Sequence, residues 1–367
     1  MTSLFDPVRL GAVALGNRIV MAPMTRTRAA PGRIPGGVMC EYYSQRAGAG
    51  LILTEATSVS PQGVGYPNTP GIWSRKQMLG WQDITRAVHD RNGRIFLQLW
   101  HVGRVSDPEY LNGQMPVGPS AIRCEGYISL MQPKHEYVVP RAMHSGEIRT
   151  VVADFVEGAR NAKGAGFDGI EIHAANGYLI DQFLRDGANQ RLDAYGGSIG
   201  NRIRLLLEIV DGCIGVWGSD RVGVHLSPHH NLHSVWDSDT PALFSRVAQE
   251  LGQRRIAFLL VRETNEDRSL TPLLKREFGG AIVVNGGYDL ALAQRAVDER
   301  RADAVAFGKP FIANPDLVTR LREGAPLNTC DTATFYGSGR KGYVDYPALD
   351  GRAWCLAVPE AERREAD

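Results

Sequence analysis

The sequence has almost no net charge and no long apolar run. It contains 41 Lys and Arg against 40 Asp and Glu, and no basic block. Because nucleic acids are bound through clustered cations that neutralise phosphates, we expect no nucleic acid partner. Nowhere do about 18 uncharged apolar residues follow one another, and Met1 to Arg9 form no apolar run behind a positive flank. We therefore expect no membrane association and no secretory signal.

Cysteine is also scarce, and its positions form no pattern. The cysteines are odd in number and without Cys-x-x-Cys spacing: Cys40, Cys124, Cys213, Cys330 and Cys355. Such usage is typical of a reducing compartment, so we expect a cytoplasmic protein. The sequence leaves open whether the protein is a monomer or a homodimer.

Short apolar runs alternate with helical patterns along most of the chain. After a hairpin over 8–20, strands are expected at 19–24, 51–56, 95–99, 169–173, 222–226, 257–261, 281–284 and 304–307. Helices are expected at 37–47, 76–91, 147–165, 201–215, 241–251, 271–278, 291–300 and 315–323. The strands lack polar alternation, which is typical of parallel strands that are buried on both faces.

Eight strand–helix units predict an α/β fold, a (β/α)8 TIM barrel with its active site at the carboxyl ends of the strands. An open doubly wound sheet is the main alternative, but no Gly-x-Gly-x-x-Gly follows an early strand. We expect one domain over residues 1–347, with a lid or small hairpin at 101–143 after the third strand. The highly charged residues 348–367 are expected to form a solvated tail.

Polar side chains gather after the fourth strand, where His173 is followed by Asn176 and Tyr178. Each unpaired polar group in a protein interior costs about 1–3 kcal/mol, so three of them together indicate a pocket. Two neutral donors beside a phenol suit the binding of an oxygen atom and the supply of a proton. Any one of the three alone is equally compatible with a structural turn.

Two turns that contain glycine follow the last two strands. Gly286-Gly287 and Gly308-Lys309 expose backbone N–H groups with a cation beside them. Barrels of this type often bind phosphate at this place, although glycines at barrel corners can also be purely conformational. Together with the donor-rich strand end, these turns suggest a phosphorylated cofactor.

Longer motifs make the prediction more specific. In chain order they are Met21 to Arg26, Gln98 to Arg104, Gly166 to Phe183, Asn189 to Ser198 and Ala313 to Leu317. They resemble the old yellow enzyme family of FMN-dependent NAD(P)H ene-reductases, and the similarity runs from Leu4 to Pro347. The resemblance implies a barrel that holds FMN, takes hydride from NADPH or NADH, and reduces a small-molecule electron-poor alkene with a carbonyl or nitro group.

By this resemblance the catalytic residues are His173, Asn176 and Tyr178. The first two would bind the substrate oxygen, where negative charge grows as hydride adds, and Tyr178 would protonate the α-carbon. The implied cofactor-binding residues are Pro23, Met24, Thr25, Ala56, Gln98, His225, Gly286, Gly287, Gly308 and Lys309. The implied substrate-binding residues are Tyr66, Trp100, His173, Asn176 and Tyr336. The aromatic members of this set are also compatible with ordinary core or rim positions.

Three positions depart from the family pattern. His225 stands where Arg is usual at the end of the fifth strand, Lys309 stands where Arg is usual beside the phosphate, and Gly200 stands where Glu is common near a helix start. His is fully charged only when protonated, with a reference pKa of ~6.5, and Lys lacks the bidentate fork of Arg. We therefore expect weaker FMN retention and a flavin potential that depends on pH through His225.

The loop from Pro228 to His233 adds three histidines to His225, but no Cys, Asp or Glu at ligand spacing before Asp237. We expect no metal there, because flavin performs hydride chemistry without one. Two other functions remain open. One is an isomerase or dehydrogenase of a specific biosynthetic intermediate on the same fold, and the other is a flavin-poor binding protein. Tyr178 favours net reduction because the proton donor is present.

Overall fold

The computed structural model describes residues 2–264 and 268–349, in which eight parallel strands form a closed barrel. The barrel strands are β3 (Ile19–Met21), β4 (Leu51–Leu53), β6 (Ile95–Trp100), β9 (Gly169–His173), β10 (Val222–Leu226), β11 (Phe258–Arg262), β12 (Ile282–Asn285) and β13 (Ala304–Phe307). β3 pairs with β13 and β4 pairs with β6, which closes the ring. The predicted (β/α)8 barrel is confirmed. The expected tail lies outside the described residues from 350 onward.

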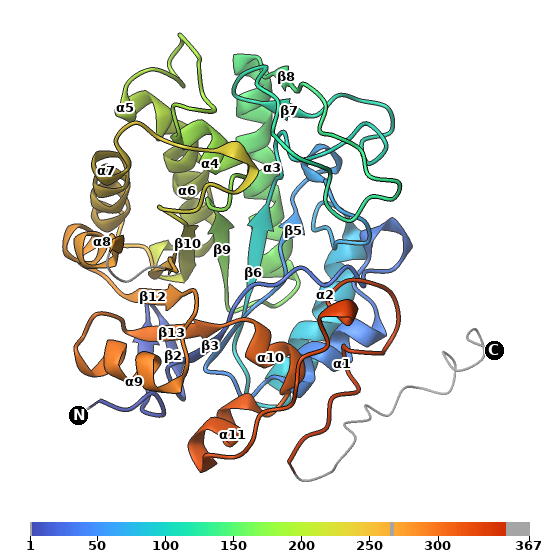
Figure 1. Ribbon diagram of the computed structural model, residues 1–367, viewed down its shortest axis with the longest axis vertical. Helices are drawn as coiled ribbons and strands as arrows, with labels where there is room; N and C mark the ends of the chain where they lie inside the picture. The colour runs from blue at the N-terminus through green and yellow to red at the C-terminus, as the bar shows by residue number, and fades with distance from the viewer. Residues whose placement is uncertain (1, 265–267, 350–367) are drawn as a thin grey trace.

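Helices connect successive strands and cover the outside of the barrel (Figure 1). The main ones are α1 (Gly37–Gln45), α2 (Arg75–His89), α3 (Ser145–Gly164), α6 (Arg204–Trp217), α7 (Thr240–Gln253), α8 (Thr271–Phe278), α9 (Leu290–Asp298) and α11 (Leu317–Glu323). Shorter ones are α4 (Leu179–Leu184), which begins directly after Tyr178 where a helical pattern was expected, α5 (Ile199–Arg202) and α10 (Lys309–Ala313), which was not predicted. No helix in the described ranges combines the length and hydropathy that a membrane span requires.

The helices follow from apolar spacing and capping. On α3, buried side chains recur every three or four residues, at Ile148, Val151, Phe155 and Ala159, and this stripe packs on the barrel. α2 begins at a capping box. The Ser74 hydroxyl accepts a hydrogen bond from the backbone N–H of Gln77, and the Gln77 side-chain oxygen accepts one from the backbone N–H of Ser74. These local signals explain why the sequence predicted both helices.

The amino end of the barrel is sealed, which leaves the carboxyl end for a site. The hairpin β1 (Val8–Leu10) and β2 (Val13–Leu15) packs its apolar side chains against Phe96 in the barrel interior. The Phe96 ring lies over Gly169, where an added Cβ would be 2.3 Å from the ring. The barrel bottom is therefore filled by side chains at interior packing density.

The insert after β6 lies beside the carboxyl ends of the strands (Figure 1). It contains the short parallel pair β7 (Val117–Gly118) and β8 (Arg141–Ala142), and an antiparallel bridge between Tyr127 and Glu136. The short strand β5 (Thr57–Ser58) extends the sheet next to the end of β6. Apolar side chains of the insert pack against the aromatic residues at this end of β6, so the insert covers one side of the open end.

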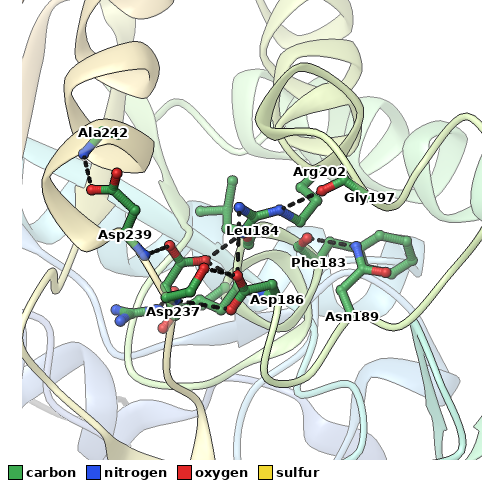
Figure 2. Close-up of polar contacts among 12 residues, drawn as sticks. Phe183, Leu184, Asp186, Asn189, Gly197, Arg202, Asp237, Asp239 and Ala242 are labelled. Atoms are coloured by element: carbon green, nitrogen blue, oxygen red, sulfur yellow. Dashed lines mark hydrogen bonds and ion pairs between the residues drawn. The ribbon is translucent and has the colours of Figure 1, made fainter.

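Buried polar contacts hold the loop after β10 in place (Figure 2). Arg202 forms an ion pair with Asp237, and the backbone N–H of Asp186 donates to Asp237 at 3.1 Å. Asp239 caps α7 by accepting from the backbone N–H of Ala242 at 3.0 Å. The loop that follows β10 is thereby fixed to the segment that follows α4.

The motif from Asn189 to Ser198 belongs to this scaffold. The Asn189 amide donates to the carbonyl oxygen of Phe183 at 2.7 Å (Figure 2). Arg191 donates to the carbonyl oxygens of Pro119 and Met143, at 2.9 and 2.6 Å, near the two strands of the insert. The motif therefore anchors the insert.

Candidate active site

The turn after β9 carries three predicted site residues and is tightly held. Asn176 has a φ of 58°, a left-handed conformation that Asn tolerates better than most residues. Its backbone N–H donates to Ser227 Oγ at 2.7 Å, and its carbonyl oxygen lies 2.7 Å from Nδ1 of His233. The turn places His173 and Tyr178 on either side of Asn176 and fixes all three relative to the end of β10.

Aromatic rings form a continuous cluster from β6 to β10. The Trp100 ring stacks on that of His173 at 6.5 Å, and the His173 ring stacks on that of His225 at 5.0 Å. Tyr178 meets His173 and Trp100 edge-on, at 5.1 and 4.9 Å between ring centroids. The Tyr178 hydroxyl lies 2.9 Å from that of Tyr66. The structure therefore brings these predicted catalytic and substrate-binding residues together.

A cavity of about 540 Å³ opens beside this cluster at the carboxyl ends of the strands. Ligand sites typically measure about 300–1,000 Å³. The predicted residues that line it are Pro23, Met24, Thr25, Asn176, His225, Gly286, Gly287, Gly308, Lys309 and Tyr336. Among the described lining residues, Arg26, Arg262 and Lys309 are cations and none is Asp or Glu. A cavity with this charge suits an anionic ligand such as a phosphate-bearing cofactor.

The predicted phosphate end has the geometry of a close backbone approach. Gly286 and Gly287 have φ values of 118° and 78°. A Cβ added at Gly286 would lie 2.2 Å from the carbonyl oxygen of Glu263, so no larger residue fits there without moving the backbone. Gly308 comes directly before α10, whose first residue is Lys309. These residues fit the expected phosphate group of FMN.

Two predicted cofactor residues, Ala56 and Gln98, lie outside the cavity lining. Ala56 packs in the apolar cluster with Tyr66 and Trp100. Gln98 is buried below the cavity, where its Nε2 donates to Glu171 Oε2 at 2.6 Å and lies 3.4 Å from His225 Nδ1. In the structure, Gln98 therefore lies between the buried Glu171 carboxyl and the Nδ1 atom of His225.

Two buried ring nitrogens point to a ligand. Within the described residues, His173 Nδ1 and His225 Nε2 have no hydrogen-bond partner. Buried polar atoms are normally paired, so these two fit a site that a bound group completes. Burial lowers the pKa of His173 to about 3 and the pKa of His225 well below its ordinary value, and nearby Arg262 lowers both further. Both imidazoles are therefore neutral, and this argues against the expected pH dependence through His225.

Two other groups keep their protons at neutral pH. Burial raises the pKa of Tyr178 well above its ordinary value, and the neighbouring Tyr66 raises it further. Burial also raises the pKa of Glu171 to about 8, an effect that the hydrogen bond from Gln98 reduces. Tyr178 therefore holds its proton until a strong base takes it, and Glu171 is mainly a neutral carboxylic acid.

Two histidines of the loop after β10, His229 and His233, have separate partners. His233 contacts the Asn176 carbonyl, and His229 Nε2 lies 3.6 Å from Glu263. In residues 2–264 and 268–349, no three or more His, Cys, Asp and Glu side chains are arranged to hold a metal ion. Here the histidines position the turn after β9 and the end of β11.

Sequence reasoning missed two residues that the structure places at the site. Ser227 accepts the backbone N–H of Asn176, and Arg262 donates from Nη1 to Asn176 Oδ1 at 3.0 Å. Their position at strand ends was the available signal. Which groups they contact depends on the register between β9, β10 and β11, and a single sequence does not fix that register.

Comparison with known proteins agrees with this geometry. The model of the NADH:flavin oxidoreductase / NADH oxidase family matches residues 3–328. A probable flavin mononucleotide-dependent alkene reductase of Leishmania infantum is 41% identical over 355 residues, which cover 94% of this chain and 97% of the relative. The 12-oxophytodienoate reductase 1 of Oryza sativa subsp. japonica is 40% identical over 361 residues, which cover 95% of this chain and 93% of the relative.

Comparison with solved structures agrees with this family match. An old yellow enzyme homologue from Zymomonas mobilis superposes with a TM-score of 0.93 at 45% identity, over 95% of this chain and 100% of the other. Morphinone reductase in complex with tetrahydroNAD superposes with a TM-score of 0.92 at 46% identity, over 95% and 98% of the two chains. The resemblance seen in the motifs is confirmed. The chain belongs to the NADH:flavin oxidoreductase / NADH oxidase family, and it is an oxidoreductase of the old yellow enzyme type with FMN and reduced nicotinamide as its cofactors.

Proposed function

We propose that this protein is an NAD(P)H-dependent ene-reductase that reduces the activated C=C bond of an α,β-unsaturated carbonyl or nitro compound. The main support is the contact between Tyr178 and His173, because a phenol and an imidazole with an unpartnered nitrogen lie side by side, and the His173 ring stacks on His225 of the cavity lining. When bound, FMN supplies the hydride chemistry. The residues of the chain bind the substrate, orient it and supply the proton.

In this proposal His173 and Asn176 hold the substrate oxygen. A neutral imidazole donates one hydrogen bond, and the Asn176 amide donates two. Negative charge develops on that oxygen during reduction, so donors that are already in place lower the barrier. Since burial lowers the pKa of His173 to about 3, this residue acts as a neutral donor. The contacts of Asn176 with Ser227 and His233 keep the turn from relaxing.

Tyr178 is the proposed proton donor to the α-carbon. Its raised pKa keeps the phenol protonated at all working pH values, and the carbanion-like carbon of an enolate is a strong enough base to take the proton. The Tyr66 hydroxyl, 2.9 Å away, can donate a hydrogen bond to the resulting phenolate. Trp100 packs against the Tyr178 ring and limits its movement.

We further propose that FMN occupies the cavity along its length. The phosphate would lie at Gly286, Gly287, Gly308 and Lys309, and the flavin ring would lie between His225 and the segment Pro23 to Thr25. The lining residues support this orientation because both glycine turns, His225 and Pro23 to Thr25 all belong to one cavity lining. Tyr336, which is 48% exposed, would close the rim.

Tyr178→Phe tests the proposal. General acid catalysis typically contributes 10²–10⁴-fold, so we expect cyclohexenone turnover to fall by about that factor, while reduction of bound FMN by NADPH or NADH changes little. Tyr195→Phe is the matched control, because Tyr195 bonds to Glu208 on the scaffold and has, among the contacts of the described residues, none with His173 or Asn176. Both variants are assayed anaerobically.

Three results would contradict the proposal. Purified protein without a flavin absorption spectrum after supply of FMN indicates a binding protein. Conversion of substrate that needs no nicotinamide indicates an isomerase. If Tyr178→Phe and Tyr195→Phe turn over substrate at the same rate, Tyr178 is not the proton donor.

A further inference from the structure

Arg262 is a cation at the mouth of the barrel to which the family resemblance gave no role. It is the last residue of β11 and lines the cavity. His225 on β10 pairs in register with Leu260 on β11. Alternate residues of a strand point to the same side, so Arg262 lies on the same face as Leu260, one layer closer to the cavity mouth than His225.

The other positive side chains of the described cavity lining are Arg26 and Lys309. Arg26 is buried, and its guanidinium donates to Tyr42 and to the carbonyl oxygens of Phe335 and Gly342. Lys309 lies at the glycine turns of the proposed phosphate end. Since burial lowers the pKa of His225, Arg262 is the cation that remains, among the described lining residues, for the part of the cavity beside Asn176.

Arg262 also determines how the Asn176 amide is oriented. A guanidinium has only donors, so the atom that it contacts at 3.0 Å must be the amide oxygen. The amide NH2 group of Asn176 is thereby left to donate elsewhere. Because the backbone of Asn176 is held by Ser227 and His233, the side chain has little other freedom.

We propose that Arg262 is the positioning residue of this site: it turns the Asn176 amide so that its NH2 group meets the substrate oxygen, and it provides the positive charge for the part of FMN that becomes negative on reduction. The inference rests on the proposed function and adds a residue that acts through Asn176 and through its charge. Its guanidinium has five N–H donors, of which Nη1 contacts Asn176, so the others can face a bound anion.

The test compares Arg262→Met and Arg262→Lys with the wild type and with Lys309→Met. All four proteins are saturated with FMN, and thermal unfolding confirms that each is folded. The midpoint potential of bound FMN and the kcat and KM for cyclohexenone are measured for each. Lys309→Met is the matched control, because it removes one positive charge from the same cavity lining but from a side chain that, in the described part of the chain, makes no contact with Asn176 like that of Arg262.

For Arg262→Met we expect reduced FMN to be bound at least tenfold more weakly relative to oxidised FMN, which lowers the midpoint potential by about 30 mV for a two-electron couple. We also expect the KM for cyclohexenone to rise roughly tenfold, because a charge-assisted hydrogen bond no longer orients the amide. Arg262→Lys restores the potential, since the charge remains, but restores KM only in part, since the planar fork is lost. Lys309→Met weakens FMN binding and changes the potential less than Arg262→Met.

The proposal is overturned if Arg262→Met binds reduced and oxidised FMN in the same ratio as the wild type and keeps the same KM. It is also overturned if Lys309→Met lowers the potential as much as Arg262→Met, because the effect is then one of total charge. If the wild-type protein neither takes up FMN nor reduces cyclohexenone, the proposed function fails and this inference fails with it. A functional wild type with unaffected variants refutes the role of Arg262 alone.

Discussion

The buried pair of Arg185 and Asp181 determines whether the turn after β9 keeps its shape. Nε of Arg185 donates to Asp181 at 2.8 Å, and its two terminal nitrogens donate to the carbonyl oxygens of Ser227 and Pro228, at 2.8 and 3.0 Å. Asp181 also accepts the backbone N–H of Gly177 at 2.9 Å. Both side chains are essentially inaccessible to solvent, at 1% and 0% exposure. The pair therefore links the turn after β9 to the end of β10.

We predict that Arg185→Met lowers the free energy of unfolding by about 3–5 kcal/mol, the usual cost of leaving one partner of a buried pair uncompensated. Three charge-assisted hydrogen bonds are lost, and Asp181 is left unpaired in a site where burial already raises its pKa. The pKa of Asp181 then rises further. The loss of stability is therefore smaller at acidic pH, where the carboxyl is protonated in both states, and larger at pH 8.

The assay is urea unfolding at a fixed FMN concentration, since ligand binding shifts apparent stability. Arg160→Met is the control, because Arg160 pairs with Glu157 on the surface of α3 at 60% and 56% exposure, and such pairs contribute less than about 1 kcal/mol. The double variant Asp181→Leu with Arg185→Met should lose less stability than the sum of the two single variants. A loss for Arg185→Met no larger than that for Arg160→Met, or strict additivity, refutes this account of the turn.

Two further predictions concern the barrel interior and the phosphate end. Glu171→Gln should flatten the pH dependence of stability. The pKa of Glu171 in the folded protein, about 8, lies above the unfolded value, so the wild type loses up to about 1.4 kcal/mol of stability per pH unit as pH rises through this interval. The neutral variant does not lose this stability, and urea unfolding at pH 5 and pH 8 measures the difference. Gly286→Ala should weaken FMN binding about 5- to 150-fold, the equivalent of ~1–3 kcal/mol of backbone strain, as measured by flavin fluorescence. Gly287→Ala should weaken it less, because an added Cβ meets nothing within 4 Å there. Equal affinities for the two alanine variants would contradict the steric argument.

Much of the fold was predictable because its signals are local. Apolar runs without polar alternation predicted the barrel strands, and the helical patterns between them predicted helices where α2 and α3 lie. The short helix α10 was missed. It has fewer than two full turns of sequence, so it shows no apolar period long enough to detect.

The candidate site was predictable where one strand end carries several polar groups. His173, Asn176 and Tyr178 lie within six residues and required no knowledge of pairing. The contacts of Glu171 were not predictable, because Gln98 comes from β6 and His225 from β10. The burial that lowers the pKa of His225 was likewise not visible in the sequence, so the expected pH dependence assumed an imidazole with an ordinary pKa.

In a barrel of parallel strands, a positive charge on one strand can replace a positive charge on a neighbouring strand at the same site. All carboxyl ends converge on one cavity, so a cation on β11 faces the same ligand as a cation on β10. At its own position on β10, His225 replaces the positive charge of the arginine that is usual there. On the neighbouring strand β11, Arg262 lies one layer closer to the barrel mouth than His225. The charge of such a site is therefore determined by the residues that share its rim, and the substitution at His225 has to be judged together with Arg262.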